Sequence, residues 1–491
     1  MGYLLLIPIV FPLLAGVPVF FIKERKARRI LISAVVVIDA LMVYALAFMP
    51  DTSFTLWTIS GSLEIMFQID GISRFFSCLI VSVWALVAFF AFEYITHEDN
   101  EARFLGFYTM TMGVMVGLAF SGSMPTLYML YEMMSMITVP LVIHTRTREA
   151  IMAGLKYLGF SVFGAGCGLF GMFFLNKYCE TLAFVPGGTL LTNIVSGHEN
   201  WLLFVYLVMM IGFGCKAGML PLHAWLPTAH PVAPAPASAV LSGVITKGGV
   251  LAIIRVTYYM VGADFLRGTW VQYTLLALAI CTVFMGSMLA FKEKLLKKRM
   301  AFSTVSNVSY VLFGLFLMSP DGLTGALLQV MFHSIAKNIL FCCAGAIIYK
   351  THKTYVYELK GIGKQMPIVM WCFTFASLSL VGIPPAAGFM SKWFLATGGI
   401  AATFSGGMGF LPILGASVLM ASALLTAGYL VTIVRDAFFP GKDFDYSTLE
   451  KKEPSPLMTV PLIIMSVAVI VLGMYPVGLI NGINCIASSI L

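Results

Sequence analysis

The sequence has few charged side chains, and this scarcity excludes an ordinary soluble fold. Asp, Glu, Lys and Arg make up only 11% of the 491 residues, whereas soluble domains typically carry about 25%. Hydrophobic residues make up 59% of the chain, and no long polar stretch interrupts them. We therefore predict a single membrane domain over residues 1–491, in place of the roughly three soluble domains that the length alone would suggest.

The motifs of several kinds of catalytic centre are also missing. None of the nine cysteines belongs to a Cys-x-x-Cys pair, so no iron–sulfur or zinc site is predicted. A Gly-x-x-x-x-Gly-Lys-Ser/Thr loop is absent as well, which excludes ATP as the driving ligand. We expect no metal, no cofactor and no redox or hydrolytic site in this chain, and it stays open whether the chain is part of an enzyme.

Apolar segments recur from one end of the chain to the other. A bilayer core of ~30 Å needs about 20 residues of helix, and the sequence predicts about fourteen transmembrane helices in an all-α polytopic membrane protein. The connections 50–71 and 176–201 are predicted to be loops too short for a catalytic domain. The predicted helices lie near 3–22, 30–49, 72–94, 104–122, 125–143, 154–175, 202–220, 235–262, 270–291, 300–318, 323–349, 366–395, 409–434 and 456–482.

The basic residues predict the orientation of these helices. The formal net charge is +8, but Lys and Arg fall in short segments between apolar runs, which favours a topology signal and not nucleic-acid binding. They concentrate in alternate loops, whereas the opposite loops hold little beyond Lys177 and Arg267. Because basic loops stay in the cytoplasm, we expect a multi-pass protein of the cell (inner or plasma) membrane with both termini on the outer side.

Two of the predicted helices, the seventh and the twelfth, contain proline-rich breaks. The first break lies in the region 201–262, which is interrupted by Pro221, Pro227, Pro231, Pro234 and Pro236, and the second is Gly382-Ile-Pro-Pro385. Proline removes a backbone donor and breaks helix, and such breaks are tolerated at membrane depth only where protein or a wet cavity satisfies the freed groups. Interrupted helices in the two halves of a transporter mark an ion path.

Ionisable side chains lie inside several apolar segments. Each costs ~2.5–3.5 kcal/mol even on a lenient insertion scale, and such residues are functional by default. The alternative is that each lysine reaches an interface or closes a structural ion pair, but so many deep charges near two breaks favour an ion path, most simply for protons. The candidates are Glu132, Lys216, Lys247, His333, Lys337 and Lys392.

The chemistry assigns these residues different roles. Glu132 and Lys216 are predicted to form an ion pair, because a lysine that gains or loses a carboxylate partner switches between holding and releasing a proton. Lys247, beside small neighbours, is the predicted central relay. His333, Lys337 and Lys392 are expected to converge in a hydrated cavity, although Lys392 could instead point outward into the following loop.

Further polar residues have two readings each. His223 and His230 flank the first break and could be relays or could cap freed carbonyl groups. Lys156 could be a third candidate relay or a plain cytoplasmic anchor. Asp70 and Arg74 are four residues apart at the start of a helix, and we predict a structural ion pair between them.

At these residues the sequence resembles the antiporter-like subunits of respiratory complex I, multi-subunit Na+/H+ antiporters and energy-converting membrane hydrogenases. The resemblance is carried by Glu132 and by four blocks, and covers about residues 70–395. The blocks are Lys216-Ala-Gly-Met-Leu-Pro-Leu-His-Ala-Trp-Leu-Pro-Thr-Ala-His-Pro with the following Ala-Pro-Ala-Ser-Ala-Val-Leu-Ser-Gly-Val-Ile-Thr-Lys247, Lys298-Arg-Met-Ala-Phe-Ser-Thr-Val-Ser, His333-Ser-Ile-Ala-Lys337, and Gly382-Ile-Pro-Pro-Ala-Ala-Gly-Phe-Met-Ser-Lys392.

The resemblance implies fourteen helices with two inverted five-helix repeats. Helices 1–3 would occupy residues 1–103, the first repeat (helices 4–8) 104–262, the second repeat (helices 9–13) 263–435, and helix 14 436–491. It further implies other membrane subunits and peripheral redox subunits with iron–sulfur clusters as partners, together with lipid. A lysine at 392 departs from the family branch that carries glutamate there.

Three functions compete. The first is a proton- or cation-translocating subunit of a redox-driven complex, similar to complex I or to an energy-converting hydrogenase. The second is a subunit of a multi-subunit Na+/H+ antiporter, and the third is a stand-alone solute transporter, which would need a midplane pocket. Lysines without matching acids or aromatics argue against the third.

Overall fold

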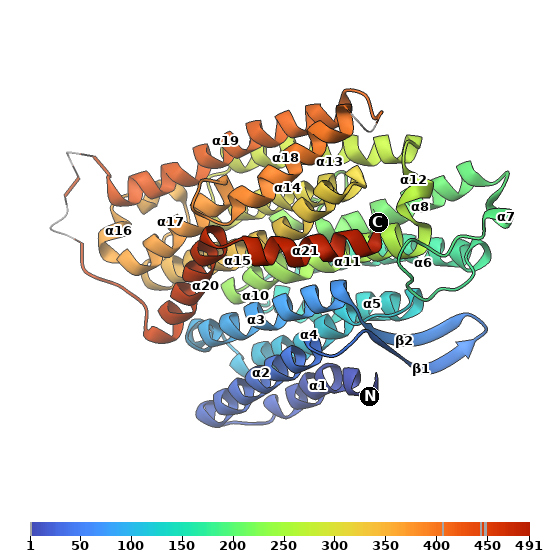
Figure 1. Ribbon diagram of the computed structural model, residues 1–491. Coiled ribbons are helices and arrows are strands. Elements are labelled where there is room, and N and C mark those ends of the chain that lie inside the picture. Colours follow the sequence, from blue (N-terminus) through green and yellow to red (C-terminus); the bar gives the residue numbers. More distant parts are fainter. Residues whose placement is uncertain (1, 405–406, 442–443, 446–448) are drawn as a thin grey trace.

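The apolar segments form long helices, because a chain surrounded by lipid must satisfy its backbone N–H and C=O groups internally. The computed structural model describes residues 2–404, 407–441, 444–445 and 449–491. Within these residues, twelve helices are long and apolar enough to cross a membrane. They run side by side in one bundle, and both termini lie at the same end of it (Figure 1).

The first half of the chain contains one β-hairpin and the helices up to the second π-helical segment. Its elements are η1 (Gly2–Leu6), α1 (Ile7–Val19), α2 (Arg25–Ala47), β1 (Thr52–Ser60), β2 (Leu63–Ile69), α3 (Gly71–Tyr94), η2 (Ile95–His97), α4 (Glu101–Ala119), α5 (Met124–Val142), α6 (Arg148–Tyr178), α7 (Thr192–Val195), α8 (Glu199–Ala217), α9 (Leu226–Val232), α10 (Ala235–Val240), η3 (Leu241–Ile245), α11 (Thr246–Ile254) and η4 (Arg255–Val261).

The regular elements in the second half of the described chain are all helices. Its elements are α12 (Ala263–Leu266), α13 (Trp270–Lys292), α14 (Leu296–Leu317), α15 (Pro320–Thr351), η5 (Val356–Leu359), α16 (Ile362–Gln365), α17 (Pro367–Val381), α18 (Gly388–Phe404), α19 (Leu411–Phe438), α20 (Pro456–Met474) and α21 (Val477–Ile490).

The helical membrane fold is confirmed, with two local differences. The twelve spans together with α5 and the broken pair α17–α18 occupy the fourteen predicted segments, although the count of fourteen and the inverted repeats stay predictions. The segment 456–482 was predicted to be one helix and is divided into α20 and α21, because Pro476 stands at the N-cap of the second and has no N–H to continue the first.

The connection 50–71, predicted to be a loop, forms an antiparallel hairpin of β1 and β2. The side chains of β1 are largely exposed, whereas those at the end of β2 are buried against the bundle. The predicted pair of Asp70 with Arg74 is wrong. Asp70 binds Arg255, at 2.5 Å, and Arg74 binds Asp51, at 2.7 Å, because the hairpin and η4 bring those partners to the start of α3.

Both predicted helix breaks are confirmed. α8 ends at Ala217 and α17 ends at Val381, and each is followed by a glycine with positive φ, Gly218 at +84° and Gly382 at +87°. A left-handed residue at this position closes a helix end and favours glycine. The chain resumes in α9 after the first break and in α18 after the second.

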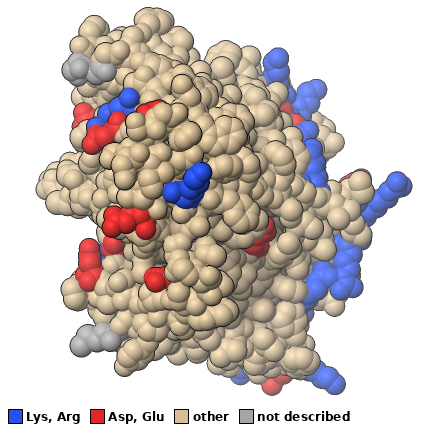
Figure 2. All heavy atoms as spheres, turned by 90° about the vertical axis from the view of Figure 1, so that its right-hand side faces the viewer, with Lys and Arg blue, Asp and Glu red and all other residues tan. Residues whose placement is uncertain are grey.

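The centre of the bundle consists of three elements. The run from α10 to η4, α14 and α15 are almost completely buried, whereas α1, α2, α19 and α20 bury 33–39% of the residues in their spans. Figure 2 shows Lys and Arg gathered along one edge of the molecule, while most of the visible surface carries neither charge. This separation of basic and apolar surface suits a protein that crosses a bilayer.

Candidate functional site

Lys247 and His333 form a direct contact at the centre of the bundle. The Nζ atom of Lys247 lies 2.7 Å from Nδ1 of His333, and these residues are only 2% and 1% exposed. Lys247 comes from α11 and His333 from α15, so the contact joins the two halves of the chain. For the ammonium group to donate, Nδ1 must be the unprotonated nitrogen of the imidazole.

The π-helical segment η3 shapes this contact. Lys247 also donates to the backbone oxygen of Ser242, at 2.6 Å, five residues earlier in the same run. A π-helix widens the helical turn, and such segments are frequent at functional sites. The absence of a side chain at Gly243 lets η3 approach α15, since a Cβ atom there would lie 1.8 Å from Nδ2 of Asn338.

Lys337 and His230 lie near the contact between Lys247 and His333. Lys337 lies one turn after His333 and donates to the backbone oxygen of Met300, at 3.0 Å. His230 is fully buried and stacks on Phe341 with ring centroids 4.7 Å apart. Both ring nitrogens of His230 lack a hydrogen-bond partner among the described residues, so the ring is able to accept or donate a proton.

Lys216 is held by hydroxyl groups beside the first break. Its Nζ atom donates to Ser135 (3.0 Å), Tyr157 (2.7 Å) and Ser161 (3.0 Å), and it lies 4.3 Å from the centroid of the Tyr157 ring. These partners come from α5 and α6. The three hydroxyls and the aromatic face together stabilise a buried cation without any carboxylate contact.

The predicted ion pair between Glu132 and Lys216 is not formed in this structure. No N–O distance of 4.0 Å or less joins these two described side chains. Glu132 is half-buried, accepts a 3.5 Å hydrogen bond from Tyr128, and leaves its other carboxylate oxygen unpartnered. Ser135 lies three residues further along α5 and takes the ammonium group instead. Glu132 therefore lies about one turn of α5 from the serine that binds the ammonium group.

Lys392 is buried at the second break and does not point outward. It is 7% exposed, and its Nζ atom donates to the backbone oxygens of Leu380 (2.5 Å) and Val381 (2.6 Å). These carbonyl groups end α17, where the helix leaves its last acceptors unsatisfied and the helix dipole favours a cation. The break folds α18 back, so that a lysine following it reaches the helix end preceding it.

No described hydrogen bond joins Lys392 to His333 or Lys337, and their convergence stays a prediction. The described hydrogen bonds connect Lys392 to α15 only through its neighbour: Ser391 donates to Gln329 (2.6 Å), and Gln329 donates to Asn307 (3.3 Å). Gln329 lies one turn before His333 on α15. A buried line of polar side chains therefore runs from α18 across α15 to α14.

The remaining candidates lie nearer the ends of the helices. His223 is half-buried in the first break, with an unpartnered Nδ1 atom, and is within electrostatic range of Lys156. Lys156 is half-buried on α6. Neither residue contacts the pair of Lys247 and His333.

Lys297 was not among the predicted site residues, because it lies among the basic residues of a predicted loop. Lys297 is 9% exposed and donates to the backbone oxygen of Pro231, at 3.2 Å, and to that of Ala233. A cavity of about 270 Å³ is lined by Lys297 and Glu98. Burial raises the pKa of the Glu98 carboxyl, an effect that Lys297 opposes and Asp99 reinforces.

Asp39 was also missed, although its signal was plain: an acid within the apolar run of α2. It is fully buried, and neither carboxylate oxygen has a hydrogen-bond partner among the described residues. The hydroxyl groups around Lys216 could not be found in this way, since Ser, Thr and Tyr are common in membrane helices and nothing in their spacing predicts which of them meet.

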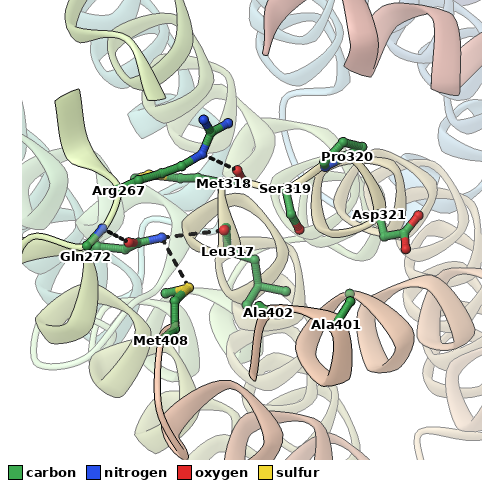
Figure 3. A pocket seen from close by; sticks show the side chains of 12 residues that line it. Arg267, Gln272, Leu317, Met318, Ser319, Pro320, Asp321, Ala401, Ala402 and Met408 are labelled. Carbon is green, nitrogen blue, oxygen red and sulfur yellow. Dashed lines mark hydrogen bonds between the residues drawn. The ribbon is translucent and has the colours of Figure 1, made fainter. Parts of the chain in front are cut away.

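A larger cavity lies away from the lysines. It has a volume of about 390 Å³ and is lined by Arg267, Gln272 and Asp321 at the ends of α13, α14 and α15. Figure 3 shows Gln272 and Arg267 directed toward the end of α14, where Arg267 donates to the backbone oxygen of Met318, at 3.0 Å. Asp321 is twelve residues from His333, about 18 Å along a helix.

Comparisons with known proteins place this geometry in context. Residues 121–414 match the family model described as NADH:quinone oxidoreductase/Mrp antiporter, transmembrane. The chain is 29% identical over 417 residues to NADH-quinone oxidoreductase subunit N of Desulforudis audaxviator, covering 81% of each chain. It is 30% identical over 344 residues to hydrogenase-4 component B of Escherichia coli, covering 67% of this chain and half of that protein.

The same fold occurs in a solved structure. A chain in the structure of the Mrp complex from Dietzia sp. DQ12-45-1b superimposes with a TM-score of 0.85, at 20% sequence identity, over 99% of this chain and 97% of that one. The matched family region contains Glu132, Lys216, Lys247, His333, Lys337 and Lys392.

Proposed function

We propose, from the premise that this chain belongs to the NADH:quinone oxidoreductase/Mrp antiporter transmembrane family, that it is a proton-translocating membrane subunit of a multi-subunit complex. The observation that carries the proposal is the 2.7 Å contact between Lys247 and His333, deep in the bundle. In this contact a charged ammonium group donates a hydrogen bond to a neutral imidazole. No carboxylate takes part that would hold the proton on the lysine.

A proton crosses this contact without moving the backbone. The Lys247 ammonium gives its proton to Nδ1 of His333, which leaves a neutral amine and an imidazolium ion. The imidazolium then carries a second proton on Nε2, an atom with no described partner. Loss of that proton, toward Lys337 on one side or the polar line at Gln329 on the other, returns the ring to its neutral state.

The cavity lined by Glu98 and Lys297 supplies an entrance to this relay. Lys297, Lys337 and Lys247 all lie within electrostatic range of His230. Lys297 binds the backbone at the end of α9, the same short helix that carries His230. A proton entering at Glu98 would therefore meet Lys297, then His230, and then the central lysines.

Lys216 and Glu132 form a switch at the side of the relay. A Cβ atom at Gly249 would lie 2.6 Å from the backbone oxygen of Phe213 and 3.0 Å from Cβ of Lys216, so the helices carrying Lys247 and Lys216 are in close contact. When Lys216 leaves the hydroxyls for Glu132, it gains a carboxylate that favours its charged form. That movement changes the field at Lys247.

The partners are other membrane subunits, as in the multi-subunit complexes of the relatives. We assign peripheral iron–sulfur redox subunits as further partners, because hydrogenase-4 component B and NADH-quinone oxidoreductase subunit N are named for redox complexes. The protein is a multi-pass membrane protein, and we place it in the cell (inner or plasma) membrane. The basic edge of Figure 2 then faces the cytoplasm and both termini face outward.

An Mrp-type antiporter subunit is the second candidate, since the family model that matches the chain covers Mrp antiporters as well as NADH:quinone oxidoreductases. A stand-alone solute transporter has less support. The cavity in Figure 3 lies at the ends of the helices and includes none of the buried lysines. Identification of the subunits that co-purify separates the candidates: redox subunits support the first, and antiporter subunits support the second.

Transport by the reconstituted complex tests the proposal. Lys247→Met and His333→Ala should each reduce coupled proton uptake, measured with a pH-sensitive dye, at least tenfold while the complex still assembles. The matched control is Lys292→Met, at the exposed end of α13, which should leave uptake unchanged. Full uptake in the Lys247→Met complex would rule out this relay.

A further inference from the structure

A groove with basic and apolar walls lies at one end of α2, α3 and α20. It has a volume of about 520 Å³, and its lining includes Arg25, Lys26 and Arg29 beside Ile30, Phe92 and Leu457. α3 packs against both α2 and α20, so Phe92 forms the floor and the two other helices form the walls. None of these residues takes part in the relay.

The groove carries positive charge that the chain does not neutralise. The segment 23–29 and Glu101 together hold five cations and two carboxylates, a surplus of three positive charges. Glu101 is shared by Arg25 (2.7 Å), Arg28 (3.4 Å) and Arg29 (3.4 Å). Lys26 is exposed and has no described carboxylate within 4.0 Å.

The basic residues also stand at the unfavourable end of their helix. A helix N-terminus attracts anions and disfavours cations, yet α2 begins Arg-Lys-Ala-Arg-Arg. Its N-cap residue, Glu24, makes no side-chain capping hydrogen bond. An anion placed in the groove would be favoured both by these cations and by the free N–H groups of the first turn.

A second cavity, lined mostly by apolar side chains, lies further along α3. That cavity, of about 330 Å³, is lined by Leu79 and Leu86 of α3, Tyr44 of α2 and Met465 and Leu472 of α20. Leu86 lies six residues from Phe92, about 9 Å along the helix. The basic groove and this cavity therefore follow one another along α3, between α2 and α20, and we call the two together the furrow.

We propose that this furrow binds an anionic phospholipid, with the phosphate group at Arg25, Lys26 and Arg29 and the acyl chains along α3. A basic pocket between membrane helices on the cytoplasmic side is suited to an anionic headgroup. The apolar continuation distinguishes a lipid from free phosphate, which needs no hydrocarbon channel. It also distinguishes a lipid from an acidic protein segment, which would lie across the basic end only. The acyl chains would pass between the exposed side chains of Ile30 (61% exposed) and Leu457 (43% exposed) on their way from the basic groove to the apolar cavity.

Thermal unfolding of the purified complex tests this site. Dioleoylphosphatidylglycerol should raise the unfolding midpoint more than dioleoylphosphatidylcholine does. Lys26→Glu should raise the phosphatidylglycerol concentration for half-maximal effect about tenfold, and Ile30→Trp, which narrows the groove, should do the same. Lys292→Glu makes the same charge change at another exposed basic position, and it should leave the response unchanged.

A second measurement counts the lipid that co-purifies. Mass spectrometry of the washed complex should find less phosphatidylglycerol per complex with Lys26→Glu than with Lys292→Glu. Equal effects of the two lipids, equal behaviour of the two lysine variants, or full stabilisation by inorganic phosphate would overturn the proposal. So would a photo-crosslinker at position 30 that captures a protein subunit and no lipid.

Discussion

The two helix breaks hold their lysines in different ways. Lys216, before the first break, is bound by three hydroxyl groups from α5 and α6, whereas Lys392, after the second, is bound by two backbone carbonyls that end α17. Hydroxyl groups rotate and can exchange partners, but carbonyls at a helix end are fixed by the fold. Lys216 can therefore change partners when a neighbouring group moves, whereas Lys392 keeps its two carbonyl partners.

The largest effects should come from removing the two lysines. Lys216→Met and Lys392→Met should each reduce coupled proton transport at least tenfold, about 1.4 kcal/mol in the barrier. Stability should separate them. Lys392→Met strands two carbonyls at about 1–3 kcal/mol each, whereas Ser135 and Tyr157 keep hydrogen bonds to Tyr131 and Thr138 when Lys216 is lost.

Uptake into proteoliposomes and thermal unfolding of the complex measure the two effects. Destabilisation of equal size in the two variants would mean that the hydroxyl groups are as rigid as the carbonyls. The comparison between the breaks would then fail.

The glycines that close the breaks give the next largest effects. Gly218→Ala and Gly382→Ala should each destabilise the complex by about 1–3 kcal/mol, because both need a positive φ. A Cβ atom at Gly382 would lie 2.8 Å from Cδ of Lys392, whereas at Gly218 it would lie 2.3 Å from Cδ1 of Leu226, an apolar side chain. Only Gly382→Ala should therefore move a lysine.

Transport normalised to the amount of folded complex checks this difference. Gly166→Ala is the matched control, since nothing lies within 4 Å of its added Cβ. We expect normalised transport to fall for Gly382→Ala alone, and an equal fall for Gly218→Ala would show that strain, and not the displacement of Lys392, is the cause.

Much of the fold could be predicted because the bilayer imposes it. Runs of apolar residues with few charges can only be helices there, and proline and glycine mark both breaks in the sequence. The hairpin of β1 and β2 was missed because a segment outside the membrane follows no such rule. The division between α20 and α21 depends on Pro476, whose apolar neighbours made one long segment the simpler interpretation.

The site was predictable in its charges and not in its contacts. Lys247, His333 and Lys392 are conspicuous because ionisable residues are rare in apolar segments, and all three are buried. Which acceptor each lysine meets depends on helix packing. The sequence favoured the Glu132 carboxylate as the partner of Lys216 and a hydrated cavity for Lys392. Lys216 instead binds hydroxyls and Lys392 binds carbonyls, groups that every stretch of the chain offers.

A smaller effect should follow from removing one of the three hydroxyl groups that bind Lys216. Tyr157→Phe removes the 2.7 Å hydrogen bond but keeps the ring that lies 4.3 Å from the ammonium group. We expect a loss of about 1.5 kcal/mol in stability, at the low end for a hydrogen bond to a charged group, because the aromatic contact remains. Thermal unfolding measures it, and Tyr206→Phe, which removes a buried hydroxyl paired with Thr257 and not with Lys216, is the control. A loss above about 3 kcal/mol would show that the tyrosine hydroxyl cannot be replaced by its neighbours.

The smallest effect tests whether Lys216 moves between Ser135 and Glu132. Ser135 holds the Lys216 ammonium one turn from Glu132 on α5, so the serine and the glutamate compete for the same cation. Ser135→Ala should let Lys216 move toward Glu132, which makes the carboxylate more important for transport. Glu132→Gln should then reduce transport more in the Ser135→Ala background than alone, with an interaction free energy of about 0.5–1 kcal/mol. Ser161→Ala removes an equivalent hydroxyl from α6 and should show no such interaction, because α6 does not carry the glutamate. Since independent changes add within about 0.3–0.5 kcal/mol, additive effects for Ser135 and Glu132 would mean that Lys216 does not move between them.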